Sequence, residues 1–198
     1  MNKESKLLII FTVFACICAI TGGTFAYWAW NSSNVQNTLI NFTVPQGFSC
    51  SADGGGNITS TTIKLAPAVC SSSPDTTKLI KRTVTVNRTI SQPGDTVYLD
   101  LWLKVNSIDS GLNGTHNFKY ALTTSASTCT SGTVVASGDF YGATAGTKKT
   151  LIDDKAYTTS GSETYYLWIW LDSAETGAMN QAFFLELGGS CTEQPPSS

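Results

Sequence analysis

Apolar and polar residues alternate along most of the chain after residue 30, and this pattern constrains the fold more than any other feature of the sequence. A period of two residues is typical of a β-strand that buries one face. The clearest case is residues 97–105, where one face carries Val97, Leu99, Leu101, Leu103 and Val105. The other face of the same segment carries Tyr98, Asp100, Trp102 and Lys104.

Further alternating segments run to the end of the chain, and the residues that mark them are Ile40, Phe42 and Val44; Ile63 and Leu65; Val84, Val86 and Ile90; Phe118, Tyr120 and Leu122; Val134 and Val135; Leu151 and Ile152; Tyr165, Leu167, Ile169 and Leu171; Phe183, Leu185 and Leu187. Turn residues separate them, as in the Pro-Gly turn at residues 92–95. The pattern predicts an all-β, two-sheet antiparallel β-sandwich, Ig-like or jelly-roll-like, of about eight or nine strands. A closed barrel is the alternative.

The segments between these strands are expected to be loops. The glycine-rich residues 53–57 are interpreted as a flexible loop, residues 109–114 as a hairpin loop, and the charged residues 153–155 as a solvated loop. The tail at residues 192–198, which contains two prolines, is expected to be disordered.

The N-terminus has the layout of an export signal. Lys3 and Lys6 precede an uncharged run at residues 7–20, and Ala26 is the expected cleavage position, with Tyr27 as the new N-terminus. The alternative is an uncleaved membrane anchor that extends to about residue 30. We therefore expect a signal at 1–26, a sandwich domain at 27–191 and a tail at 192–198. Either alternative predicts a secreted or cell-surface protein that meets the membrane only through its N-terminal segment.

Four cysteines follow the signal, namely Cys50, Cys70, Cys129 and Cys191. An even number in an exported chain predicts disulfides. Three pairings are possible, and we favour Cys50–Cys70 with Cys129–Cys191 because the first pair closes a short loop. The alternative is four free, buried thiols.

The composition excludes several functional classes. Lys and Arg number 12 against 14 for Asp and Glu, so the basic surplus of a nucleic-acid-binding protein is missing. His116 is the one histidine, which excludes His-based triads and two-His metal sites. Phosphate-loop, dinucleotide, zinc-protease and nucleophile-elbow motifs are also missing. The sequence therefore predicts a non-enzymatic protein with no cofactor and no metal; the residual enzyme hypothesis is a hydrolase that pairs Asp153 or Asp154 with Glu163 or Asp172.

Large aromatic residues point away from the predicted core on the two strongest strands. They are Trp102 on one strand and Tyr166, Trp168 and Trp170 on the other. Because an exposed aromatic patch usually marks a binding face, these four residues form the candidate binding face. Three covers are possible: another segment of the same chain, another subunit, or a ligand such as a sugar ring.

Residues 20–28, Ile-Thr-Gly-Gly-Thr-Phe-Ala-Tyr-Trp, resemble the signal end of the camelysin/TasA-type exported proteins of Gram-positive bacteria. The turn at Pro93-Gly94-Asp95 is also similar to the body of that family. The resemblance implies a β-sandwich and, for some members, assembly into fibres of the biofilm matrix. In such fibres the N-terminal segment completes the sheet of a neighbouring subunit. By position residues 27–44 would be that segment here.

The candidate donor strand is Ile40, Phe42 and Val44, which alternate and stop at Pro45. Such a segment can pair with its own sheet or with a neighbour. We therefore expect an exported structural protein of the cell surface or extracellular matrix, with a fibre subunit as the finer hypothesis. Its partners would be further copies or another surface protein. The alternative is a monomeric surface binding or adhesion module that recognises a glycan through its outward aromatics.

Overall fold

The computed structural model describes residues 38–41, 48–60, 67–92, 94–129, 133–172 and 181–193, and the side chains of all of these except 38–41, 48–55 and 67. The expected signal, its cleavage position at Ala26 and Tyr27, and the donor-strand residues Phe42 and Val44 lie outside the described residues. Within the described part, no helix has the length and hydrophobicity that crossing a bilayer requires.

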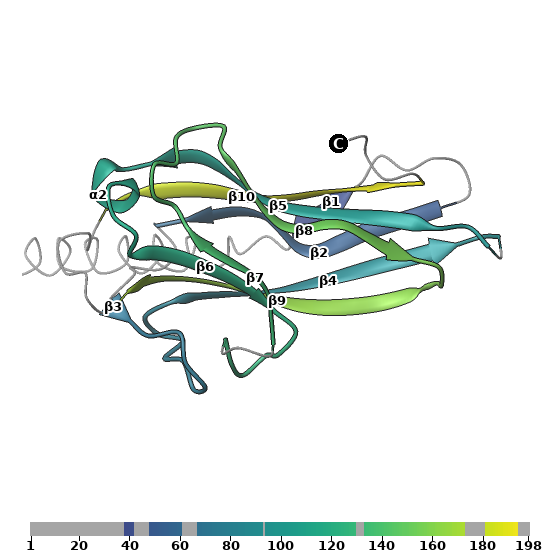
Figure 1. The fold of residues 1–198 in the computed structure, drawn as a ribbon, viewed down its shortest axis with the longest axis horizontal. Coiled ribbons are helices and arrows are strands. Elements are labelled where there is room, and N and C mark those ends of the chain that lie inside the picture. The colour runs from purple at the N-terminus through teal and green to yellow at the C-terminus, as the bar shows by residue number, and fades with distance from the viewer. Residues whose placement is uncertain are drawn as a thin grey trace, which may run out of the picture. The chain divides into compact units, whose positions relative to one another are not determined.

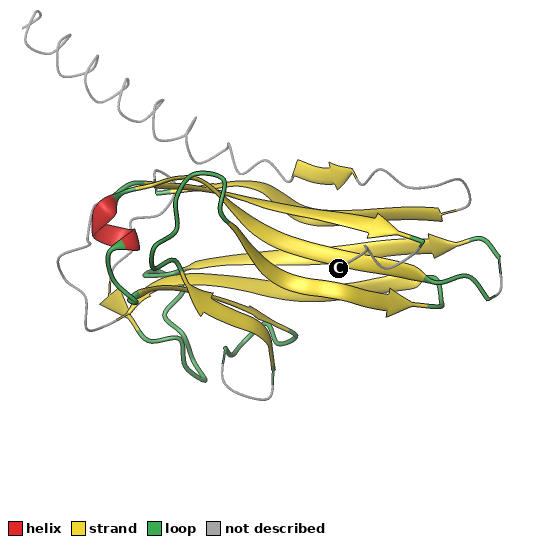
Figure 2. Ribbon diagram, turned by 45° about the horizontal axis from the view of Figure 1, so that its top comes forward, coloured by secondary structure: helices red, strands yellow, loops and turns green. Residues whose placement is uncertain are grey.

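The described chain is almost entirely β-structure. Its strands are β1 (Thr38–Asn41), β2 (Phe48–Thr59), β3 (Pro67–Ala68), β4 (Ile80–Ile90), β5 (Val97–Ile108), β6 (Phe118–Thr123), β7 (Val134–Asp139), β8 (Lys148–Tyr157), β9 (Gly161–Asp172) and β10 (Phe183–Thr192). One short helix, α2 (Ser110–Asn113), stands where a hairpin loop was expected. Figure 2 shows this helix at one end of the strands.

The strands form two antiparallel four-stranded layers, which confirms the predicted β-sandwich. One layer has the order β7-β6-β9-β4, and the other has the order β2-β10-β5-β8. Figure 1 shows the two layers one above the other. A hydrogen-bonded path connects them because β2 belongs to both: its first half pairs with β4 and its second half with β10.

The change of layer within β2 explains the glycine-rich run, whose interpretation as a flexible loop was wrong. Residues 48–53 pair with β4, while residues 56–59 pair with β10, so residues 54 and 55 stand between the two pairings. Gly56 has φ of 99°, a conformation that residues with a side chain rarely adopt. A strand that switches sheets needs such a bend, and glycine permits it.

The core lies between the layers and follows the predicted alternation. On β5, Leu99, Leu101 and Leu103 are fully buried while the residues between them are half-exposed. On β9, Tyr165, Leu167 and Ile169 are likewise buried in the same core. The turn at residues 92–95 is present, with the Asp95 amide donating to the Gln92 carbonyl and Gly94 at φ of 98°.

Strand β1 pairs antiparallel with β2 of the same chain. Thr38 lies opposite Gly55, Ile40 opposite Ala52, and Asn41 opposite Ser51. In this structure the start of the candidate donor strand therefore lies on its own sheet. Of the two pairings that the sequence left open, this is the one within the chain.

Candidate functional site

Strand β9 is apolar on both faces, and its outer face carries Tyr166, Trp168 and Trp170. These three residues alternate with the core residues of β9 and belong to a second, smaller hydrophobic cluster. That cluster also contains Leu79, Cys70 and Cys129. Trp168 is fully buried, and Tyr166 and Trp170 are half-buried. The outer aromatic row of β9 is therefore buried at its central residue, Trp168, and half-buried at the residues on either side.

The buried indole of Trp168 also makes a hydrogen bond. Its Nε1 donates to Oγ1 of Thr123 at 2.8 Å, and that hydroxyl donates to the Ser125 carbonyl at 2.9 Å. Thr123 lies on the neighbouring strand β6 and is fully buried. Because a buried polar group without a partner costs about 1–3 kcal/mol, this relay helps to fix the position of the indole.

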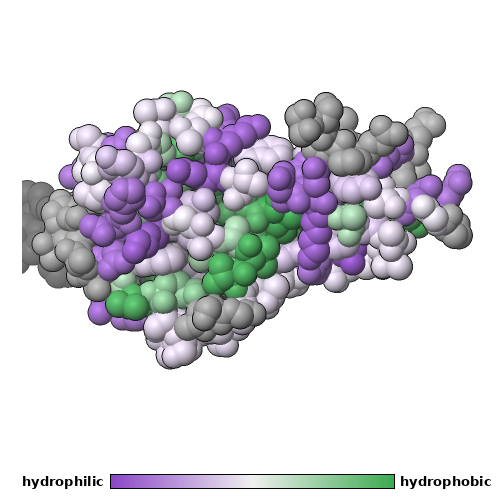
Figure 3. Space-filling model, in the orientation of Figure 1, coloured by the Kyte–Doolittle hydropathy of each residue, from purple (hydrophilic) through white to green (hydrophobic). Residues whose placement is uncertain are grey.

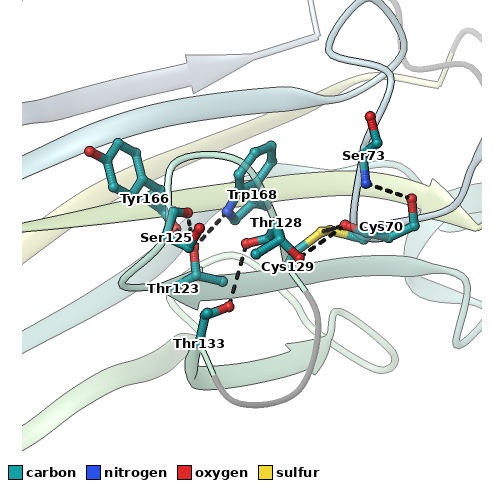
Figure 4. Close-up of a disulfide and its surroundings, with 10 residues drawn as sticks. Cys70, Ser73, Thr123, Ser125, Thr128, Cys129, Thr133, Tyr166 and Trp168 are labelled. Carbon is teal, nitrogen blue, oxygen red and sulfur yellow. Dashed lines mark hydrogen bonds between the residues drawn. A yellow bond between two sulfur atoms is a disulfide. The ribbon is translucent and has the colours of Figure 1, made fainter.

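Two loops of the same chain cover this row, and we call them the stapled cap: residues 69–79 and residues 124–129. The disulfide Cys70–Cys129 joins them, with the two Cα atoms 5.7 Å apart. Figure 4 shows the disulfide beside Trp168 and Thr123. The Cys129 amide also donates to the Ser71 carbonyl at 3.3 Å, so backbone and disulfide bind the loops together. Of the three covers considered, the intramolecular one is present.

The disulfide corrects the favoured pairing. Cys70 bonds to Cys129 and not to Cys50, so Cys129 does not bond to Cys191. The strand order explains the difference, because β4 separates β2, which carries Cys50, from β9. Cys70 follows β3 and Cys129 follows β6, and both of these strands pair with β9. Cys191 is also disulfide-bonded, to a partner whose side chain is not among those described.

Lys81 completes the cover from β4. Its Nζ lies 5.0 Å from the Trp168 ring and 5.1 Å from the Tyr166 ring, and it donates a hydrogen bond to the Ala126 carbonyl in the stapled cap. A cation over an aromatic ring is attracted to it by about 0.5–2 kcal/mol. Lys81 therefore ties the aromatic row to the cap on the side opposite Thr123.

The four aromatics of the candidate binding face do not share one surface. Trp102 lies on β5, in the other layer, where its outer neighbours are Lys148 and Gly188. The Lys148 Nζ lies 4.4 Å from the Trp102 ring. The expectation that Trp168 is available to a ligand is wrong, because its side chain has 0% relative exposure. Trp170 and Tyr166 remain half-exposed at either end of the covered row.

A groove of about 330 Å³ adjoins the exposed end of the row. Its lining comes from the disulfide, from β6 and β7, and from β9, and comprises Cys70, Lys119, Tyr120, Ala121, Cys129, Val134, Ser137, Gly138, Asp139 and Trp170. Figure 3 shows hydrophobic residues gathered where Figure 1 draws β7 and the start of β8. On β7, Val134 and Val135 are 37% and 43% exposed.

The charged groups of the groove already have partners. Lys119 Nζ lies 2.6 Å from Oδ2 of Asp172, and Asp139 Oδ2 lies 2.8 Å from Nδ1 of His116. Burial would raise the pKa of Asp139, but hydrogen bonds from His116 and the Tyr141 amide hold that pKa below its usual value. Asp139 is therefore an ionised hydrogen-bond acceptor at neutral pH.

The carboxylates considered for a hydrolase do not pair with one another. Glu163 binds Lys155 at 2.7 Å, and Asp172 binds Lys119 at 2.6 Å. Asp153 and Asp154 lie within strand β8, so the solvated-loop interpretation of this segment was wrong. Asp154 has φ of 48°, and its amide donates to Oδ1 of Asp100. Lysines thus engage Glu163 and Asp172, while Oδ1 of Asp154 is buried without a hydrogen-bond partner among the described residues, so these groups do not form a catalytic pair.

Glu163 belongs to a polar network at the end of the sandwich. The Tyr157 hydroxyl donates to its Oε2 at 2.5 Å, and Lys155 Nζ also donates to the Tyr165 hydroxyl at 2.6 Å. Burial would raise the pKa of Glu163, but the hydrogen bonds from Lys155 and Tyr157 outweigh it and lower that pKa. Burial would lower the pKa of Lys155, and its contacts with Glu163 and Tyr165 raise it instead.

This network predicts an acid-sensitive contribution to stability. A carboxylate whose pKa is lowered on folding stabilises the fold above its unfolded pKa, and this stabilisation is lost as the pH falls through the folded pKa. We expect the free energy of unfolding to fall below about pH 5, and Glu163→Gln to reduce that slope. Urea unfolding, followed by circular dichroism at several pH values between 3.5 and 7, measures how the free energy of unfolding depends on pH. Asp153→Asn, at an exposed site on β8, is the control; equal slopes for Glu163→Gln and the parent protein would contradict the prediction.

Sequence reasoning found the aromatic row but missed the residues that position and surround it. Thr123, Lys81, Lys119 and Asp139 belong to no motif. The one signal is for Lys119 and Thr123, which occupy the face of β6 opposite the core residues Phe118, Tyr120 and Leu122. Comparison with protein-family models, curated proteins and solved structures found no match to this chain.

Proposed function

We propose that this chain is an exported, non-enzymatic structural protein of the cell surface or extracellular matrix, and that copies assemble by adding the N-terminal strand of one to the sheet of the next. The disulfide Cys70–Cys129 is compatible with a location outside the cytoplasm. The resemblance of residues 20–28 to the camelysin/TasA-type signal end supports export to the cell surface.

The pairing of β1 with β2 carries the proposal. Strand β1 has four residues and meets β2 on the side that β4 leaves open. The same main-chain register is available to the Thr38–Asn41 strand of another copy, because backbone hydrogen bonds do not distinguish copies. Exchange of a short terminal strand is an accessible route to association, and a head-to-tail exchange that does not close builds a filament.

A cysteine pair tests whether the strand is exchanged. Asn41 and Ser51 lie opposite each other across β1 and β2, so Asn41→Cys with Ser51→Cys places two thiols at one ladder position. Under assembly conditions and mild oxidation, the doubly substituted protein should give a ladder of disulfide-linked multimers on a non-reducing gel. A mixture of the two single variants should give a linked dimer, and electron microscopy of the parent protein should show filaments.

The control pairs Asn41→Cys with Ser190→Cys on β10, a residue that lies opposite Asp100 and not opposite β1. It should give no ladder. Crosslinks confined to single chains, together with a monomeric sedimentation coefficient at all concentrations, would contradict the proposal. Removing residues 27–44 distinguishes the same alternatives, because exchange predicts a soluble monomer with a free edge on β2, whereas permanent pairing within the chain predicts aggregation.

A further inference from the structure

The groove beside the stapled cap exists because small residues lie next to large ones on the outer face of β6 and β7. Across the sheet, Ala121 is opposite Ser137 on one side and Trp168 on the other. One row further along, Lys119 is opposite Asp139 and Trp170. The small side chains of Ala121 and Ser137 leave a hollow that the larger neighbours and the disulfide border.

Trp170 gives this hollow an aromatic wall that is only partly covered by the described residues. Trp168 is enclosed by Lys81, Thr123 and the stapled cap, whereas the Trp170 side chain is only half-buried and lines the groove. Val134 on β7 and the disulfide add apolar surface to the same groove. An apolar ring face that packs on Trp170 here would lose contact with water on that face.

The polar groups of the groove provide donors and acceptors without excess charge. The exposed hydroxyl of Ser137 can do both, the Lys119 ammonium donates, and the Asp139 carboxylate accepts. Lys119 is neutralised by Asp172, and Asp139 lies against His116. A charged ligand would compete with these partners, while neutral hydroxyl groups can add to them.

We propose that this groove binds a neutral saccharide, with a sugar ring packed on the face of Trp170 and its hydroxyls bonded to Ser137, Asp139 and Lys119. A sugar ring offers an apolar C–H face together with hydroxyls that donate and accept, which matches both parts of the lining. The volume of about 330 Å³ is at the lower end of the range for ligand pockets and suits one or two rings. This site is separate from the β1–β2 pairing and does not depend on the proposed assembly.

The test uses the protein purified after export, in its oxidised form. Saturation-transfer difference NMR is recorded with glucose, galactose, mannose and N-acetylglucosamine and with their β-linked dimers, and calorimetry gives the dissociation constants. At least one saccharide should bind saturably, with a dissociation constant of about 0.1–10 mM for so open a site. Trp170→Ala should weaken that binding at least about tenfold.

Two further variants keep the result decisive. Trp102→Ala removes the same residue type from the outer face of the other layer and should leave binding within about twofold of the parent. Ser137→Tyr fills the groove from an exposed position on β7, so it should abolish binding while the melting temperature is kept. The inference is overturned if none of these saccharides binds to the parent protein, if only charged or peptide ligands bind, or if binding survives in both Trp170→Ala and Ser137→Tyr.

Discussion

Trp168→Ala is expected to lower the free energy of unfolding by about 3–5 kcal/mol, the usual cost of truncating a fully buried tryptophan. The indole is the largest fully buried side chain of the described residues and fills the space between β9 and the stapled cap. Its loss also removes the hydrogen bond to Thr123. Urea unfolding at neutral pH measures the change.

Trp102→Ala is the matched control, since Trp102 is a half-exposed tryptophan on the outer face of the other layer. Trp102→Ala should lower the free energy of unfolding clearly less than Trp168→Ala does. Trp168→Phe should fall between the two, because it keeps much of the packing and loses the bond to Thr123. Equal losses for Trp168→Ala and Trp102→Ala would contradict the burial of Trp168.

Removing the staple with Cys70→Ala and Cys129→Ala together is expected to lower stability by about 4 kcal/mol. The two cysteines are 59 residues apart in the sequence, so the crosslink restricts a long loop of the unfolded chain. The same change should speed hydrogen exchange at the Trp168 indole N–H, because residues 69–79 and 124–129 would then be held over it without a covalent bond.

The control for the staple is Val69→Ala, at a residue next to Cys70 that is 59% exposed. It should change neither the free energy of unfolding nor the hydrogen-exchange rate of the Trp168 indole N–H. A double cysteine variant that loses less than about 1 kcal/mol and keeps slow indole exchange would contradict the prediction. It would mean that backbone and side-chain contacts alone hold the cap in place.

Most of the layered fold could be predicted from alternation alone. At residues 97–105 of β5 and 165–171 of β9 every second residue is apolar and buried, so these strands and their inner faces follow directly from the sequence. Strand β2 could not be predicted in the same way, because its glycine-rich run has no side chains to alternate. Its role in joining the layers depends on pairing with two different strands, β4 and β10, which local sequence does not encode.

The site was predictable in part. The outward aromatics of β9 signalled that something covers this face, but the cover consists of irregular loops without a hydrophobic period. The disulfide pairing was missed for a related reason. Cys50 is nearer to Cys70 in sequence, yet β3 and β6 bring Cys70 and Cys129 to the same strand, β9, whereas β2 lies beyond β4.

The central claim is that two loops of this chain, joined by Cys70–Cys129, cover the outer aromatic row of β9. Non-reducing peptide mapping tests it most directly, because trypsin places each of the four cysteines in a separate peptide: the one that ends at Lys64, and 65–78, 120–148 and 156–198. Mass spectrometry of the oxidised protein should find peptide 65–78 linked to peptide 120–148, and reduction should release both. A link between the peptide that ends at Lys64 and peptide 65–78, or between 120–148 and 156–198, would contradict the claim.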